Sequence, residues 1–187
     1  MIRIFIDQGH NPENPNAGAE GNGYREQDIV YEIGIILGEL LTNNGNFEVK
    51  LSRPTADTQL GTSNATSLSA RVDAANSWGA DWYISLHTNA SEIESATGTE
   101  GFVYSLSSAA YPLATAITAS VSEYTGEPNR GVTARPSLYV LRRTSMPATL
   151  IELGFITNYS EANLMANSPG LYARAVYRGI LEFFNLL

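Results

Sequence analysis

The chain has 187 residues, of which 43% are hydrophobic and 16% are charged. This length and composition predict one globular domain over residues 1–187 with a substantial hydrophobic core. The net charge of −8 argues against nucleic acid as a partner, because an acidic surface repels the phosphate backbone. No apolar stretch approaches the roughly 20 residues that a membrane-spanning helix needs, so we expect no membrane span.

Cysteine is absent, which excludes disulfides, thiol nucleophiles and thiolate zinc sites. Histidine, aspartate and glutamate remain as the strong metal ligands. The apolar run at residues 1–7 is too short for a signal peptide and predicts a first strand instead. We therefore expect a cytoplasmic chain, a chain that is exported by another route, or a domain of a longer protein.

Apolar periodicity divides the chain into alternating strands and helices. The predicted strands cover residues 2–6, 47–51, 81–86, 101–106, 138–141 and 148–153. The predicted helices cover residues 26–42, 68–78, 109–124 and 170–184, and Ser67 is the expected cap of the second helix. Strands that alternate with helices indicate an α/β sandwich on a mixed or largely parallel sheet.

The chain contains two histidines, His10 and His87, and each follows a predicted strand. In parallel α/β sheets, ligands gather outside the carboxyl ends of the strands. Two histidines at two such ends can meet there, although a lone histidine is more often an ordinary surface or core residue. Their shared position therefore predicts a metal site.

A catalytic zinc ion usually takes three protein ligands and leaves a fourth position for water. The carboxylate candidates for the third ligand are Asp7, Glu13, Glu20, Glu26 and Glu152. Glu26 opens the predicted first helix, after a glycine-rich loop that can fold back over the strand end. The alternative for Glu26 is an acidic residue that simply favours the N-terminus of a helix.

Glu152 interrupts an apolar strand, and a carboxylate is costly to bury without a partner. The structural interpretation is a salt bridge with Arg142 or Arg143. The functional interpretation, which we favour, is a general base whose pKa is tuned by burial and by a nearby zinc ion. Zinc would lower the pKa of its bound water to ~7 and polarise the carbonyl, and Glu152 would pass the proton of this nucleophilic water to the leaving amine.

Several sequence blocks resemble the zinc-dependent N-acetylmuramoyl-L-alanine amidases of the amidase-3 family. They occur in the family's order and span nearly the whole chain. The blocks are residues 4–10 (IFIDQGH), 24–28 (YREQD), 68–76 (LSARVDAAN), 80–90 (ADWYISLHTNA) and 146–158 (MPATLIELGFITN).

The resemblance implies one zinc ion held by His10, Glu26 and His87, with Glu152 as the catalytic glutamate. It also implies a three-layer αβα sandwich with a roughly six-stranded mixed, mostly parallel sheet. The implied reaction is hydrolysis of the amide bond between N-acetylmuramic acid and L-alanine in peptidoglycan.

The chain departs from the family pattern beside the first histidine. Gln8 replaces the usual proline, and Asn11 replaces the glycine that commonly follows the histidine. Neither change removes a ligand, but both predict a different shape for this loop. Residues 91–99 are too few for the inhibitory helix that plugs the site in some members, so we expect an open site.

Two further residues are candidates for substrate binding. Asn89 lies two positions beyond His87 and either orients a ligand, binds substrate or forms a plain turn. Arg71 either holds a carboxylate of the peptide or pairs with Asp57 or Asp73 to pin a loop.

Two other functions fit the same residues. One is a zinc peptidase or carboxypeptidase that acts within the stem peptide, and the other is a non-catalytic module that binds wall peptide. For the amidase we expect peptidoglycan as the partner, a monomer, and action in the extracellular cell wall as an autolysin or endolysin. Such an enzyme would serve cell separation, spore germination or phage lysis. Because the wall polymer is also acidic, its binding would rest on short-range contacts.

Overall fold

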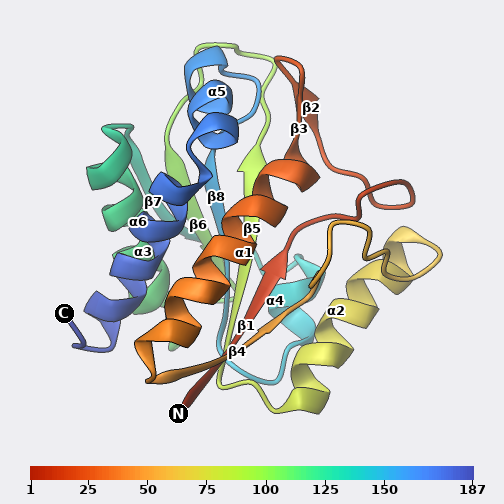
Figure 1. Cartoon of the computed structure of the whole chain (residues 1–187), viewed down its shortest axis with the longest axis vertical. Helices are drawn as coiled ribbons and strands as arrows, with labels where there is room; N and C mark the ends of the chain where they lie inside the picture. Colours follow the sequence, from red (N-terminus) through yellow and green to blue (C-terminus); the bar gives the residue numbers. More distant parts are fainter.

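The computed structural model describes residues 1–187 and shows a six-stranded sheet with helices on both sides (Figure 1). The strand order is β4-β1-β5-β8-β6-β7, and every neighbouring pair is parallel except β6 and β8. This confirms the predicted α/β class and the mixed, mostly parallel sheet. The strands are β1 (Ile2–Gln8), β4 (Phe47–Leu51), β5 (Trp82–Asn89), β6 (Thr99–Val103), β7 (Asn129–Ala134) and β8 (Ala148–Phe155).

A two-stranded hairpin, β2 (Glu20–Gly21) and β3 (Tyr24–Arg25), stands apart from this sheet. None of the helices is both long and apolar enough to cross a bilayer. The helices are α1 (Glu26–Asn44), α2 (Asn64–Trp78), α3 (Ala110–Thr125), α4 (Tyr139–Arg143), α5 (Tyr159–Asn167) and α6 (Pro169–Phe183).

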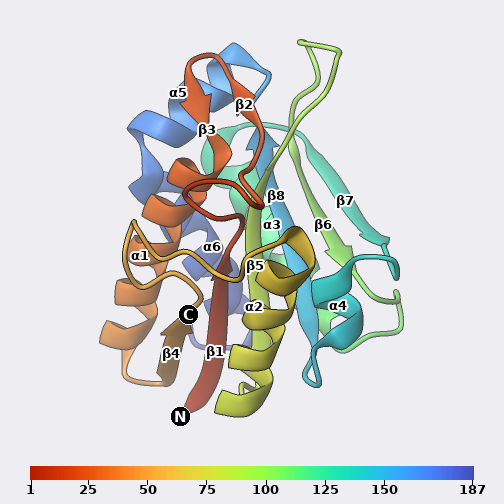
Figure 2. The same ribbon diagram turned by 90° about the vertical axis from the view of Figure 1, so that its right-hand side faces the viewer.

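The two faces of the sheet are covered unequally. Successive side chains of a strand point to opposite faces, so Ile4 and Ile6 pack under α1, α3 and α6, whereas Phe5 packs on the side of α2 and α4. The first side holds a core cluster of 27 buried residues and the second a cluster of only 10. Figure 2 shows that α2 and α4 cover the lower part of the second face, so the carboxyl-terminal parts of β5 and β8 have no helix over them.

Three predicted boundaries are wrong for local reasons. The second helix is capped by Ser63 rather than Ser67, because the Ser63 side chain accepts the N–H of Thr66 in a capping box. The run at residues 138–141 lies largely in the short helix α4 instead of a strand. Four apolar residues are too few to distinguish the 3.6-residue period of a helix from the two-residue period of a strand. The strand β5 continues through Asn89, so His87 lies inside it.

Besides the β2–β3 hairpin, two elements were not predicted at all. β7 has no buried residue, so it lacks the apolar alternation that marks a strand, and its pairing with β6 defines it. α5 is short and begins where the Asn158 side chain accepts the N–H of Glu161. Residues 90–98, which join β5 to β6, contain no helix.

Candidate functional site

The structure brings His10, Glu26 and His87 together. Glu26 Oε2 lies 3.2 Å from His10 Nε2, and Glu26 Oε1 lies 3.0 Å from His87 Nδ1. The candidate ligand atoms of the three residues all lie within 4.8 Å of one another. His10 follows β1, Glu26 opens α1 and His87 is part of β5, so three distant segments build one group of donors.

Two glycines let these side chains approach one another. A Cβ atom on Gly9 would lie 2.5 Å from Cε1 of His87, and one on Gly18 would lie 2.8 Å from Glu26 Oε2. Either contact is far inside van der Waals distance, so a larger residue would displace a side chain of the cluster. His10 itself has a positive φ of 66°, a strained value for a residue with a side chain.

The carboxylate of Glu26 is fully engaged. Besides facing both imidazoles, it accepts the backbone N–H groups of Ala19 and Thr88, each at 2.9 Å. Burial raises the pKa of Glu26, but the hydrogen bonds with His10 and His87 outweigh burial and hold the pKa well below its usual range. The carboxylate is therefore ionised at neutral pH.

A buried ion pair supports the loop that carries His10. Arg71 Nη1 lies 2.6 Å from Asp7 Oδ1, and the Ser85 hydroxyl donates to Asp7 Oδ2 at 2.7 Å. Burial raises the pKa of Asp7, but the charge of Arg71 and the Ser85 hydrogen bond lower it to about 2. Arg71 also donates to the backbone carbonyl of His10.

This placement corrects the sequence-based interpretation of Arg71. The residue pairs with Asp7, not with Asp57 or Asp73. Its side chain is only 1% exposed, and both Nη atoms donate to internal partners, whereas Nε is buried without a partner. Arg71 also lines the pocket beside His10 and His87, and its role in binding substrate stays a prediction.

Glu152 stands beside His87 in the sheet. The two residues are paired in register between β5 and β8, so their side chains lie on the same face. Glu152 Oε2 is buried and has no hydrogen-bond partner, and the salt bridge with Arg142 or Arg143 does not form. Burial, together with the negative charges of Glu26 and Glu100, raises the pKa of Glu152 to about 8.

Comparison with known proteins agrees with this arrangement. The sequence profile of the N-acetylmuramoyl-L-alanine amidase family, amidase-3, matches residues 4–182. The chain belongs to this family. It is therefore an enzyme that cleaves peptidoglycan as an amidase, as the sequence blocks predicted.

Relatives and solved structures match the chain from end to end. A sporulation-specific N-acetylmuramoyl-L-alanine amidase of Bacillus subtilis (strain 168) is 34% identical, over 100% of this chain and 69% of the relative. An endolysin of Bacillus phage SPP1 is also 34% identical, over 98% of this chain and 66% of the relative.

Among solved structures, an N-acetylmuramoyl-L-alanine amidase from Clostridium difficile 630 has a TM-score of 0.87 and 28% identity, covering 98% of this chain and 97% of its own. The CwlD amidase from Clostridioides difficile, solved in complex with the GerS lipoprotein, has a TM-score of 0.90 and 25% identity, covering 100% of both chains. These matches place the fold among the catalytic domains of amidases.

In this amidase, His10 and His87 line a pocket of about 130 Å³. Its lining is otherwise polar near the β1 end, with Asp7, Asn16 and Arg71, and apolar elsewhere, with Leu68, Leu138, Tyr139, Val140 and Leu150. Water is partly excluded there, which strengthens electrostatic interactions at the two imidazoles.

Two residues beside Glu152 complete the polar part of the site. Glu100 on β6 is paired in register with Glu152 on β8, and Asn89 Nδ2 donates to Glu100 Oε1 at 2.5 Å. Asn89, a predicted substrate-binding residue, therefore has an internal partner on this side. Glu100 was missed by sequence reasoning, although it lies two positions before Phe102 and so shares the sheet face toward α2 and α4.

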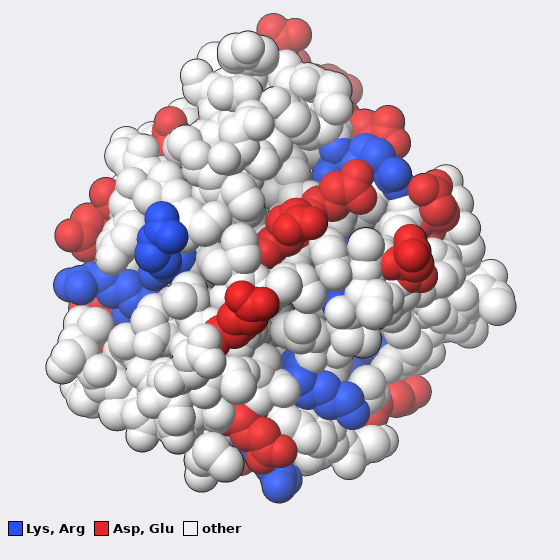
Figure 3. Space-filling view, viewed as in Figure 1, with Lys and Arg blue, Asp and Glu red and all other residues white.

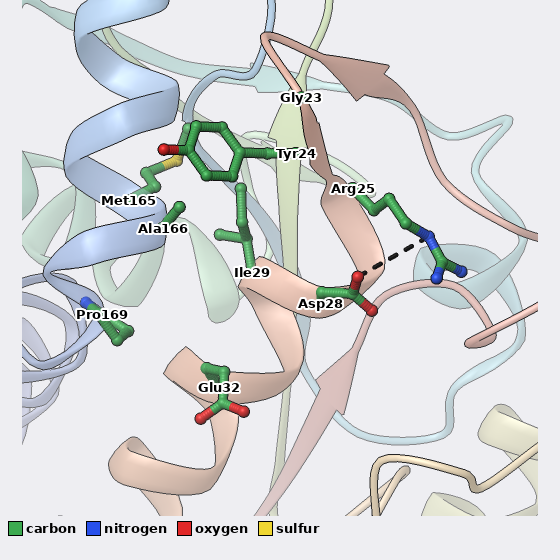
Figure 4. A pocket seen from close by; sticks show the side chains of 9 residues that line it. All are labelled: Gly23, Tyr24, Arg25, Asp28, Ile29, Glu32, Met165, Ala166 and Pro169. Atoms are coloured by element: carbon green, nitrogen blue, oxygen red, sulfur yellow. Dashed lines mark ion pairs between the residues drawn. The ribbon is translucent and has the colours of Figure 1, made fainter.

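The residues before Glu26 tie the start of α1 to the preceding loop. Figure 4 shows Tyr24 turned toward Met165, while Arg25 points the opposite way and pairs with Asp28, at 3.7 Å. Arg25 also pairs with Glu13 at 3.1 Å and donates to the carbonyl of Pro12. The pocket drawn in Figure 4, of about 280 Å³, is separate from the one that His10 and His87 line.

The surface of the amidase is acidic along α1. Asp28, Glu32 and Glu39 are exposed on this helix, and Figure 3 shows acidic side chains in a row across the same face. Such a face repels an anionic polymer. The long-range field of the protein therefore does not draw the acidic wall to this side of the molecule.

Proposed function

We propose that this amidase is zinc-dependent and hydrolyses the amide bond between N-acetylmuramic acid and L-alanine. His10, Glu26 and His87 would hold one zinc ion, and Glu152 would act as general base and then general acid. The observation that carries the proposal is the convergence of two imidazoles on one buried carboxylate, with Glu152 paired in register with His87.

The donor set fits zinc. Two imidazoles and one carboxylate form a common ligand set of catalytic zinc sites, which keep a further position open. The low pKa of Glu26 keeps this ligand ionised without competition from protons. Thr88 and Ala19 hold its two oxygens in place, as the supporting hydrogen bonds of metal ligands do.

The chemistry divides between the ion and the chain. When bound, zinc lowers the pKa of a water molecule and polarises a carbonyl group. Glu152 accepts a proton from the attacking water as the new bond to the carbonyl carbon forms. It then delivers that proton to the nitrogen as the carbon–nitrogen bond breaks, which releases an amine and a carboxylic acid. A pKa near 8 suits a group that both takes up and releases a proton near neutral pH.

Metal analysis and digestion of peptidoglycan test the proposal together. We expect about one zinc per chain, loss of activity on chelation and recovery on addition of zinc. Mass spectrometry of digested muropeptides should show intact stem peptides released from the glycan. Peptides trimmed from within would indicate the peptidase instead, and binding without any product would indicate the non-catalytic module.

The relatives also support a place of action. They include a sporulation amidase, a germination amidase and a phage endolysin, which are consistent with action on the cell wall. We infer that this chain also acts in the extracellular wall, as a monomer. Sedimentation of the purified protein in the presence of soluble muropeptides would reveal any dimer.

A further inference from the structure

Three polar side chains form a row across the open face of the sheet. His87 on β5 pairs in register with Glu152 on β8, and Glu152 pairs in register with Glu100 on β6. Residues that are directly opposite in neighbouring strands point to the same face, with Cβ atoms about 5 Å apart. The row therefore runs from the proposed metal ligand through the proposed base to a second carboxylate.

The position of Glu100 is costly for a purely structural residue. Like charges directly opposite one another destabilise a sheet. The negative charge of Glu100 is one of the causes that raise the pKa of Glu152, after burial and the charge of Glu26. No arginine or lysine pairs with Glu100 to offset this repulsion.

Only one of the two carboxylate oxygens of Glu100 has a hydrogen-bond partner, and that bond orients the group. Its Oε1 accepts from Asn89 Nδ2 at 2.5 Å, and its Oε2 makes no hydrogen bond. Asn89 is itself held, because its carbonyl accepts the N–H of Ile156 at 2.8 Å. One oxygen thus fixes the group, while the other remains free to accept from a substrate.

The same strand is anchored to the proposed base. The hydroxyl of Thr99 donates to the carbonyl oxygen of Glu152 at 2.8 Å, and Gly98 N–H donates to Glu161 at 2.8 Å. The first contact fixes the start of β6 against β8, and the second ties the residue before β6 to α5. Preorganisation of this kind is what a catalytic group needs and a solvated surface acid lacks.

We propose that Glu100 is a further catalytic residue of this amidase, which accepts a hydrogen bond from the N–H of the scissile amide and then from the departing amine. The proposal rests on the proposed function of the His10, Glu26, His87 and Glu152 site. The amide nitrogen carries one hydrogen in the substrate and gains a second from Glu152 as the carbon–nitrogen bond breaks.

The interaction becomes stronger along the reaction. A neutral amide N–H is a modest donor, whereas a nitrogen that acquires a proton and positive charge makes a charge-assisted hydrogen bond, roughly twice as strong. An interaction that is stronger in the transition state than in the ground state raises kcat rather than lowering KM. Removal of the Glu100 charge is therefore expected to lower kcat and leave KM almost unchanged.

The test compares kcat and KM of the Glu100→Gln variant with those of the wild type on two matched substrates. Glutamine keeps the shape and an acceptor oxygen for Asn89 but removes the charge. One substrate is the natural amide, and the other carries an ester oxygen in place of the N–H. We expect kcat on the amide to fall by about 10-fold or more with KM within about twofold, and kcat on the ester to change by less than about twofold.

A second readout uses the product. A stem peptide with its free amino group should inhibit the Glu100→Gln variant about 10-fold less well than the wild type. Glu92→Gln removes the same charge from an exposed position of the neighbouring loop and should match the wild type in every assay. The ratio of amide to ester rates is independent of the folded fraction, so a partly unfolded variant still gives an answer.

Equal loss on amide and ester, or unchanged inhibition by the free peptide, would overturn the role of Glu100. Full activity of Glu100→Gln would do the same and reduce the residue to an anchor for Asn89. Failure of the proposed function looks different: the wild type itself would then bind no zinc or release no intact stem peptide.

Discussion

Two glutamates of the site, Glu26 and Glu152, have the same side chain in opposite environments. Glu26 faces two imidazoles and accepts two backbone N–H groups, and its pKa lies well below the usual range. Glu152 has a buried oxygen with no partner, and its pKa is raised to about 8. Glu26 is buried and Glu152 has a buried carboxylate oxygen, so the difference arises mainly from their hydrogen-bond partners and neighbouring charges.

The comparison shows how one residue type takes two roles. A carboxylate that stays ionised can hold a cation, whereas one that gains a proton near neutral pH can transfer it. Under the proposed function, metal binding belongs to the Glu26 cluster, proton transfer to Glu152, and hydrogen bonding to the leaving amine to Glu100. Single substitutions in each region are expected to separate these roles.

The largest effect is expected from His87→Ala, which removes a donor from the Glu26 cluster. The variant should lose bound zinc and lose amidase activity by at least about 1,000-fold, because the chemistry supplied by the ion disappears. Metal content by mass spectrometry and release of stem peptide measure the two losses. A variant that keeps both zinc and turnover would show that His87 is not a ligand.

Glu152→Gln should leave the Glu26 cluster intact. We expect retained zinc and a fall in kcat of about 100- to 10,000-fold, because a glutamine amide neither accepts nor releases a proton near neutral pH. Glu92→Gln, at an exposed position, is the matched control for loss of one charge. If Glu152→Gln lost the metal while Glu26→Gln retained it, the assignments of the two glutamates would be reversed.

A smaller effect, on stability rather than on activity, is expected from Asp7→Asn, a change beneath the Glu26 cluster. This change leaves Arg71 buried without its counter-charge, which should lower the free energy of unfolding at neutral pH by about 3–5 kcal/mol. The denaturant midpoint measures the loss, and Asp57→Asn, which is exposed, is its control.

The same pair predicts a pH dependence. The folded-state pKa of Asp7 is about 2, below its ordinary value of 3.8. Its stabilising contribution is therefore complete above about pH 4 and is lost as the pH falls toward 2. The difference in free energy of unfolding between the wild type and Asp7→Asn should therefore become smaller as the pH falls over that range. Denaturant titrations at several pH values measure it. A constant difference would contradict the low pKa.

The position of each site residue along the chain was largely predictable. His10 and His87 were each expected at the end of a strand, and Glu26 at the start of a helix, so their proximity followed from the rule that parallel strands open at one edge. Glu152 was notable because it interrupts an apolar strand. The roles of these residues as ligands and base stay predictions until they are measured.

The partners of the buried charges were not predictable. Arg71 was expected to meet Asp57, Asp73 or a substrate, yet it pairs with Asp7, which lies 64 positions away. Glu100 was not considered, because nothing in its local sequence distinguishes it from a surface acid. Both contacts depend on which strands are neighbours and in which direction they run.

Local chemistry in the sequence determined the class of fold, the family and the residues that carry the donor atoms. Apolar periodicity, glycine positions and short polar segments encode these features within a few neighbouring residues. Only the tertiary structure decided that β6 runs antiparallel to β8, and so placed Glu100 opposite Glu152. Strand order and register arise from the packing of the whole core, and the pKa of a buried carboxylate depends on that packing.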